Sequence, residues 1–284
     1  MNKFLQFSPV RIILAILFIG VGVAVGQVLL NLLRSVFSIT NTSLANLLAF
    51  ILVTPMAYFA YWIYVRYVEK RDLTELGHPN AFQEFGLGSL TGFGLFGFVI
   101  AILSLLGFYR VDGIDFVLLS LIGALVGAFV SAFVQELIFR AVVYRIIETW
   151  IGTWWALAIS AIVFGLIHIS NSGATIFSTV AIALQGGIIL SAAYMLTHRL
   201  WMAVGLHSMW DFANDGVFGV GLAGQSGESL KGLFQASLSG PDIFTGGAFG
   251  VEASVIALVV VLMAGVFMLW RAYQRGLFIK RSQR

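Results

Sequence analysis

The residues with the clearest capacity for chemistry are a carboxylate and a guanidinium inside an apolar stretch. Glu136 and Arg140 lie in the run 135–140, in one of the most apolar parts of the sequence. A charge at the centre of a membrane helix costs about 2.5–3.5 kcal/mol, so these two side chains must be compensated. Because they are separated by one helical turn, they share a helix face and can pair. Taken alone, the pair fits either a structural link between helices or part of a functional site.

Further ionisable residues lie in other apolar stretches. Gly152, at a predicted turn, stands midway between Glu136 and His168, so antiparallel helices would carry these two side chains to a similar depth. His207 and Asp211 share a helix face in the same way as the first pair. Each histidine could serve only as a hydrogen-bonding residue between helices, and Asp211 could simply hold His207. Ionisable groups within a membrane are nevertheless functional candidates, and a cluster from three helices favours a site.

The composition identifies the class of protein that carries these residues. Of 284 residues, 60% are hydrophobic and 10% are charged, whereas soluble domains carry about 25% charge. The chain is therefore expected to be an integral membrane protein with the lipid bilayer as its main partner. It contains no cysteine, which excludes disulfides, thiolate zinc sites and cysteine nucleophiles. The net charge of +3 is small and indicates orientation in the membrane, not binding to nucleic acid.

The hydrophobic pattern predicts an all-α fold, a polytopic membrane bundle of about eight transmembrane helices. The expected spans are residues 12–33, 44–65, 86–107, 116–148, 154–169, 176–196, 200–212 and 251–270. We expect one integral membrane domain over residues 1–284, with a catalytic-type core at about 116–215 and a glycine-rich loop at 215–250 as the stretch with most freedom to move. The 116–148 stretch would be about 50 Å long as a helix, so it must tilt, kink or project.

The first apolar stretch is consistent with either a cleaved signal peptide or a membrane span. A cleaved signal peptide would use the small residues Ala24 and Gly26. The apolar run continues past them, which favours a span.

Basic residues predict the orientation. They occur at Lys3 and Arg11, in 66–71, around 140–145, at Arg199 and in 271–281. If every span is crossed in turn, all these positions fall on one side, which is the positive-inside pattern. We therefore expect a multi-pass protein of the cell inner (plasma) membrane with both termini cytoplasmic. The short loops and this charge pattern suggest a bacterial protein.

Three blocks now carry a resemblance to a known family. They are Gln135-Glu136-x-x-x-Arg140, Phe164-x-x-x-His168 and His207-x-x-x-Asp211. In order and spacing they resemble the Glu-Glu-x-x-x-Arg, Phe-x-x-x-His and His-x-x-x-Asn/Asp motifs of the CAAX-protease and bacteriocin-processing family of intramembrane proteases, bacterial branch. The resemblance implies an intramembrane endopeptidase, a hydrolase, that acts on a membrane-associated or lipidated peptide or a small membrane protein.

One residue departs from the family pattern. The first glutamate of the family's first motif is credited with activating water alongside the histidine of the second motif, and here that position is Gln135. An amide cannot accept a proton at neutral pH, so Gln135 cannot be a general base. Either Glu136 takes over the role, or this chain is a non-catalytic relative. Glu136 points about 100° round the helix from Gln135, so an exchange of roles needs a local twist or a π-bulge.

The catalytic hypothesis assigns Glu136, His168, His207 and Asp211 to the reaction. Glu136 with His168 would deprotonate a water that attacks the peptide carbonyl. His207, held by Asp211, would donate to the developing oxyanion. Arg140 would form an ion pair with Glu136, and the role of Phe164 is left open.

Three alternatives accompany this hypothesis. An older interpretation of the family treats the cluster as a metal site, and two histidines with carboxylates could bind zinc. The chain has no His-Glu-x-x-His motif, so we expect no metal and no other cofactor. An immunity or regulatory membrane factor that binds a peptide in the same cavity would be consistent with Gln135. A proton-coupled transporter predicts internal repeats, which the sequence does not display.

Overall fold

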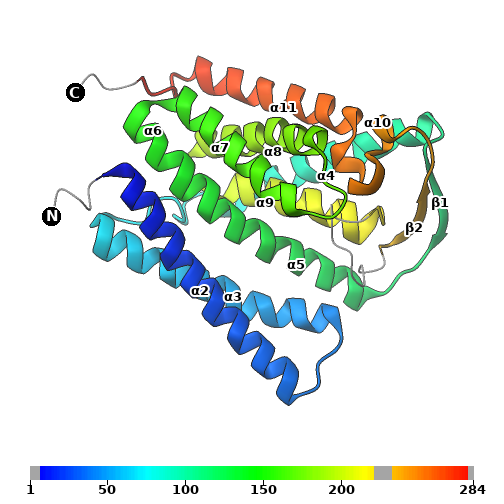
Figure 1. Ribbon diagram of the computed structural model, residues 1–284, viewed down its shortest axis with the longest axis horizontal. Helices are drawn as coiled ribbons and strands as arrows, with labels where there is room; N and C mark the ends of the chain where they lie inside the picture. The colour runs from blue at the N-terminus through cyan, green and yellow to red at the C-terminus, as the bar shows by residue number, and fades with distance from the viewer. Residues whose placement is uncertain (1–6, 221–231, 281–284) are drawn as a thin grey trace.

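Long apolar helices make up most of the protein (Figure 1). The structure is a computed structural model that describes residues 7–220 and 232–280. Lys3 and Arg281, which entered the orientation prediction, lie outside these ranges, as do residues 221–231 of the predicted glycine-rich loop. The main helices are α2 (Ser8–Val36), α3 (Thr42–Ile63), α4 (Ala81–Leu105), α5 (Leu118–Glu136), α6 (Arg145–Ile151), α7 (Thr153–Ile167), α8 (Ile176–Thr197), α9 (Trp201–Asp211) and α11 (Val255–Gln274).

The all-α membrane bundle predicted from the sequence is confirmed. Within the described ranges, seven helical segments are long and apolar enough to cross a membrane. The eighth expected span, residues 200–212, is shorter than the other seven. It consists of the 11-residue α9 and the 6-residue π-helical segment η4 (Phe212–Val217).

The short elements lie at the ends of the long helices. They are the π-helical segments η1 (Tyr64–Glu69) and η2 (Leu137–Tyr144), the 3-10 turns η3 (His168–Ser170), η5 (Gly247–Phe249) and η6 (Val251–Ala253), helix α10 (Asp242–Thr245), and strands β1 (Tyr109–Ile114) and β2 (Phe234–Leu238). The strands pair antiparallel, Tyr109 opposite Leu238, with an irregularity between Val111 and Gly113. The described part of the 215–250 stretch thus forms secondary structure, which its glycine-rich composition did not predict.

The helices are arranged so that α9 lies in the interior of the bundle. It packs against α4, α5 and α8, while α2 and α3 pack on each other and α3 packs on α5. α7 packs on α8, which in turn packs on α11. In Figure 1, α2 begins and α11 ends at the end of the bundle that also holds α6, and the two strands lie at the opposite end.

Glycines permit the close approach of α4 and α9. A Cβ atom at Gly88 would lie 2.1 Å from the Met202 carbonyl oxygen, and one at Gly92 would lie 2.1 Å from the Leu206 carbonyl oxygen. Small residues at helix interfaces in membranes allow such backbone contact. The sequence position of these glycines therefore fixes where α9, and with it His207, sits in the bundle.

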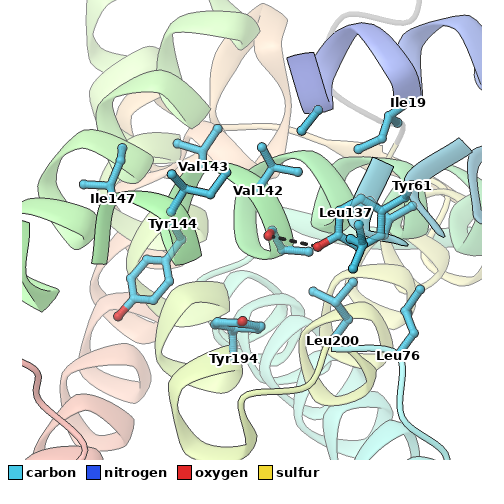
Figure 2. Close-up of a cluster of buried hydrophobic side chains, with 14 of the residues drawn as sticks. Ile19, Tyr61, Leu76, Leu137, Val142, Val143, Tyr144, Ile147, Tyr194 and Leu200 are labelled. Atoms are coloured by element: carbon cyan, nitrogen blue, oxygen red, sulfur yellow. Dashed lines mark hydrogen bonds between the residues drawn. The ribbon is translucent and has the colours of Figure 1, made fainter. Parts of the chain in front are cut away.

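The segment that links α5 and α6 has a π-helical stretch where the sequence analysis required a local twist. One continuous helical segment runs over Leu118–Ile151, and its hydrogen-bonding pattern changes to π directly after Glu136. Such changes leave backbone groups in need of partners. The carbonyl of Ala141 accepts from the Tyr61 hydroxyl at 3.2 Å (Figure 2) and from Arg145 Nε at 2.7 Å. The twist is therefore supported by side chains from another helix and from the following turn.

A hydrophobic cluster surrounds this π segment. Leu137, Val142 and Tyr144 have no exposed surface, and they pack with Tyr194 of α8 and Leu200 at the start of α9 (Figure 2). Side chains from several helices thus pack against the π segment. Its irregular backbone is protected from lipid, as irregular backbone inside a membrane protein must be.

Gly92→Ala is expected to destabilise the protein. The new Cβ would meet the backbone of Leu206, and overpacking of this kind costs about 1–3 kcal/mol. Gly94→Ala is the matched control, since nothing lies within 4 Å of a Cβ there and alanine is the better helix former. Thermal unfolding of both variants in detergent measures the difference. Equal midpoints would contradict the packing described here.

Candidate active site

A cavity of about 280 Å³ lies where α5, α7, α8, α9 and η6 meet. Its lining includes at least one residue from each of the three sequence blocks. The polar side chains in the lining are Ser131, Gln135, His168, Asn171, Gln185, His207, Asp211 and Glu252. The fold therefore brings together side chains that are far apart in the sequence.

Glu136 and Arg140 are not part of this lining and form a fully buried pair. Neither has any exposed surface. Glu136 Oε1 accepts from Arg140 Nη1 at 3.1 Å and from His207 Nδ1 at 2.8 Å. Arg140 Nη2 in turn donates to the carbonyl oxygen of Gly186 at 2.8 Å. The pair therefore links the α5–η2 segment to α8 and α9.

Phe164 is the packing centre of the site. Arg140 Cζ lies 4.7 Å from the centre of its ring, a cation–π contact. The rings of His168 and His207 lie at centroid distances of 4.9 and 6.1 Å from it. Gly186 leaves room for this ring, since a Cβ there would come within 2.7 Å of Phe164 Cε1. The side chain whose role the sequence left open thus holds both histidines in place.

His168 is held by the backbone at the end of α7. Its Nδ1 lies 2.7 Å from the carbonyl oxygen of Phe164. Because a carbonyl oxygen can only accept, Nδ1 carries the proton, and Nε2 of the neutral ring keeps its lone pair. Among the described residues, Nε2 has no hydrogen-bond partner. The second motif therefore presents a free acceptor nitrogen on a side chain that lines the cavity.

His207 is held by a hydrogen bond to Glu136, and Asp211, the partner expected from the sequence, lies beside the other ring nitrogen. Glu136 Oε1 accepts from Nδ1, which fixes the orientation of the ring. Nε2 lies 3.7 Å from Asp211 Oδ2, which is longer than a hydrogen bond. Nε2 of His207 is therefore the nitrogen available to a ligand, with the Asp211 carboxylate beside it.

Glu136, which was expected to act on a water with His168, is not part of the cavity lining, whereas His168 is. Among the described residues, no hydrogen bond or ion pair joins these two side chains. Gln135, at the preceding position, is the member of the first block that lines the cavity. Its Nε2 donates to Ser131 Oγ at 3.0 Å, and its Oε1 is buried with no partner among the described residues. The π segment begins just after these residues, and it does not turn Glu136 into the cavity.

Glu252 is a cavity carboxylate that the sequence analysis assigned no role. It lies in η6, directly before α11, and is 9% exposed. Its Oε1 accepts from Trp210 Nε1 at 2.6 Å, and its backbone carbonyl accepts from Gln185 Nε2 at 2.6 Å. It belongs to none of the three blocks. The signal that could have found it is a lone carboxylate at the start of an otherwise uncharged apolar run.

A zinc site needs three or four His, Cys, Asp or Glu side chains around one point. In the part of the chain that the structure describes, no group of three or more His, Asp or Glu side chains is arranged to hold a metal ion.

A comparison with protein-family models bears on this site. Residues 117–213 match the family model described as type II CAAX prenyl endopeptidase Rce1-like. This match confirms the predicted resemblance over these residues. The matched residues contain all three sequence blocks, whereas Glu252 lies beyond them. The comparisons with curated proteins and with solved structures gave no match.

Arg140→Met is expected to destabilise the protein strongly. Removal of one partner leaves a buried carboxylate unpaired, which costs about 3–5 kcal/mol. The double variant Glu136→Gln/Arg140→Met removes both charges, and we expect it to regain part of this loss. Thermal unfolding of the two single variants and the double variant forms a mutant cycle. Additive effects would show that the pair does not couple energetically.

Proposed function

We propose that this protein is an intramembrane endopeptidase that hydrolyses a peptide bond in a membrane-associated or lipidated peptide. The observation that carries the proposal is the pair of histidines in one cavity. His168 and His207 are both fixed through Nδ1, which leaves both Nε2 atoms available. The cavity lies inside an apolar bundle whose core matches a family of intramembrane proteases.

The two histidines suit two different steps of hydrolysis. Nε2 of His168, an acceptor, orients the attacking water, and the water oxygen adds to the carbonyl carbon of the peptide bond. Nε2 of His207, when it carries a proton, donates to the oxyanion that develops on the carbonyl oxygen. The carbon–nitrogen bond then breaks and the amine leaves with a proton. Preorganised donors of this kind contribute most where charge develops in the transition state.

We assign Glu136 a positioning role in place of the base role expected from the sequence. Its Oε1 already accepts from Arg140 and His207, and the side chain has no exposed surface. A general base must come within hydrogen-bond reach of the water that it deprotonates. Glu136 instead orients His207 and counters the charge of Arg140.

The setting of the reaction follows from the charge distribution. Glu69 forms ion pairs with Arg11 and Arg145, and Glu75 forms one with Arg71. The backbone carbonyl of Glu75 also accepts a hydrogen bond from the backbone N–H of Leu200, at the start of α9. These basic residues therefore gather at one end of the bundle. By the positive-inside rule this end is cytoplasmic. We propose a multi-pass plasma-membrane (inner-membrane) protein with both termini cytoplasmic, acting on peptides or small membrane proteins without metal or other cofactor.

His168→Ala and His207→Ala are expected to abolish proteolysis. Loss of a positioned acid–base group typically lowers the rate about 10²–10⁴-fold. The assay is cleavage of a fluorogenic peptide library by the purified protein in detergent, with and without chelator. His78→Ala is the matched control, since His78 lies in the link before α4 and outside the cavity lining.

Two results would contradict the protease proposal. One is equal cleavage by wild type and by both cavity variants, which would trace the activity to a contaminant. The other is a complete loss of cleavage in the presence of chelator, with activity restored by added zinc. That result would show that hydrolysis depends on a metal ion.

A second function is favoured by one observation, the amide of Gln135 in the cavity lining. A non-catalytic relative, an immunity or regulatory factor, would bind a peptide in the same cavity without hydrolysing it. Gln135→Glu distinguishes the two functions. An inactive wild type with an active Gln135→Glu variant would identify a silenced protease fold and support the binding factor. Cleavage by wild type would exclude it.

A further inference from the structure

The first motif does not bring to the cavity the carboxylate that was expected to deprotonate the water together with His168. Gln135 is an amide, and Glu136 has no exposed surface and lies outside the cavity lining. Two other carboxylates line the cavity: Asp211, which lies beside Nε2 of His207, and Glu252, which lies outside the three motifs. Glu252 is part of the cavity lining together with Gln135, His168 and His207.

Glu252 is fixed in place by contacts from two helices. Trp210 of α9 donates to its Oε1 at 2.6 Å, and Gln185 of α8 donates to its backbone carbonyl at 2.6 Å. The other carboxylate oxygen, Oε2, has no hydrogen-bond partner among the described residues. The side chain is nine-tenths buried. One oxygen thus anchors the carboxylate, and the second is free for a ligand in the cavity.

Trp210 also connects Glu252 to the third motif. It stands on α9 between His207 and Asp211, and all three side chains line the cavity. The indole packs edge-on against Phe96 of α4, with ring centroids 4.8 Å apart. The anchor of Glu252 is therefore itself held by the packing of α4 on α9.

We propose that Glu252 is the general base of this enzyme and replaces the carboxylate missing at Gln135. The inference rests on the proposed function and names one more catalytic residue for the same site. Oε2 of Glu252 accepts a proton from the water that His168 orients, as the water oxygen bonds to the carbonyl carbon. The same proton passes from Glu252 to the peptide nitrogen as the carbon–nitrogen bond breaks. The carboxylate is thereby regenerated, and the products are one carboxylic acid and one amine.

The surroundings of Glu252 predict its pH dependence. Burial raises the pKa of the Glu252 carboxyl, against the opposing effects of the Trp210 hydrogen bond and of His207. Asp211 is the other charged group that faces it. Four other elements pack on η6, and two of them, α8 and η5, carry no charged residue. The charged residue of α10, Asp242, lies against η5, and that of α11, Arg271, is at the far end of the helix.

A base must be ionised to act, so activity is lost as the pH falls through its pKa. As the pH is lowered, kcat is therefore expected to begin to fall at a pH above the ordinary pKa range of a glutamate side chain. Trp210→Phe removes the indole donor, and it is expected to move this fall to still higher pH.

The test compares four proteins in the same cleavage assay: wild type, Glu252→Gln, Gln135→Glu/Glu252→Gln and the control Asp242→Asn. Glutamine can still accept from Trp210, so Glu252→Gln changes the base and keeps the anchor. We expect its kcat to fall about 10²-fold or more with little change in KM. The double variant returns a carboxylate to the cavity at position 135, and we expect it to regain at least tenfold. Asp242→Asn is expected to equal wild type.

The outcomes separate this inference from the function on which it rests. If wild type cleaves, His168→Ala does not, and Glu252→Gln equals wild type, the protease stands and the role of Glu252 is overturned. If Glu252→Gln is inactive only because its thermal midpoint collapses, and Gln135→Glu restores nothing, Glu252 is structural and the inference is also overturned. If wild type cleaves no peptide, both proposals fail.

Discussion

Two opposite charges without exposed surface, Glu136 and Arg140, lie where α5 becomes π-helical. Their burial is tolerable because each finds further partners, His207 for the carboxylate and the Gly186 carbonyl for the guanidinium. A buried pair of this kind contributes little net stability, but loss of one partner is severe. The pair therefore restricts how the helices pack. Only an arrangement of α5, α8 and α9 that gives both charges their hydrogen-bond partners avoids this loss of stability. The same contacts fix the ring of His207 and place Arg140 on Phe164, against which both histidines pack.

This geometry divides the polar residues into two groups. Glu136 and Arg140 form an inner support that is buried beside the cavity, while Phe164, the histidines and Asp211 line the cavity itself. The charged residues of the first motif, Glu136 and Arg140, thus hold the site together, and the position that faces the cavity, Gln135, has an amide. We propose that Glu252, brought in by the turn before α11, restores the carboxylate. A reaction that needs one base in a fixed cavity does not require that this base keep its place in the sequence, only its place in space.

The sequence predicted the class of fold because span length and apolar composition are local properties. It also identified the residues of α5, α7 and α9 that gather, since their motif spacing and their burial in apolar runs could be read directly. It did not predict that Glu136 contacts His207 instead of His168. The direction in which the Glu136 side chain points depends on where the π segment begins, and that position could not be predicted from the sequence. Glu252 was missed because η6 reaches the cavity only through the packing of α8, α9 and α11. The strands β1 and β2 come before and after the predicted core in the sequence. Pairing between segments so far apart in the chain leaves no local sequence pattern.

The most direct test of the central claim is hydrolysis in ¹⁸O-labelled water, followed by mass spectrometry of the cleaved peptides. The chain is reconstituted in liposomes as wild type and as His168→Ala. We expect each new carboxyl terminus from wild type to carry one ¹⁸O atom, and we expect no cleavage product from His168→Ala. Products without the label would contradict direct attack by water in this cavity, and labelled products from both proteins would contradict the assignment of the site.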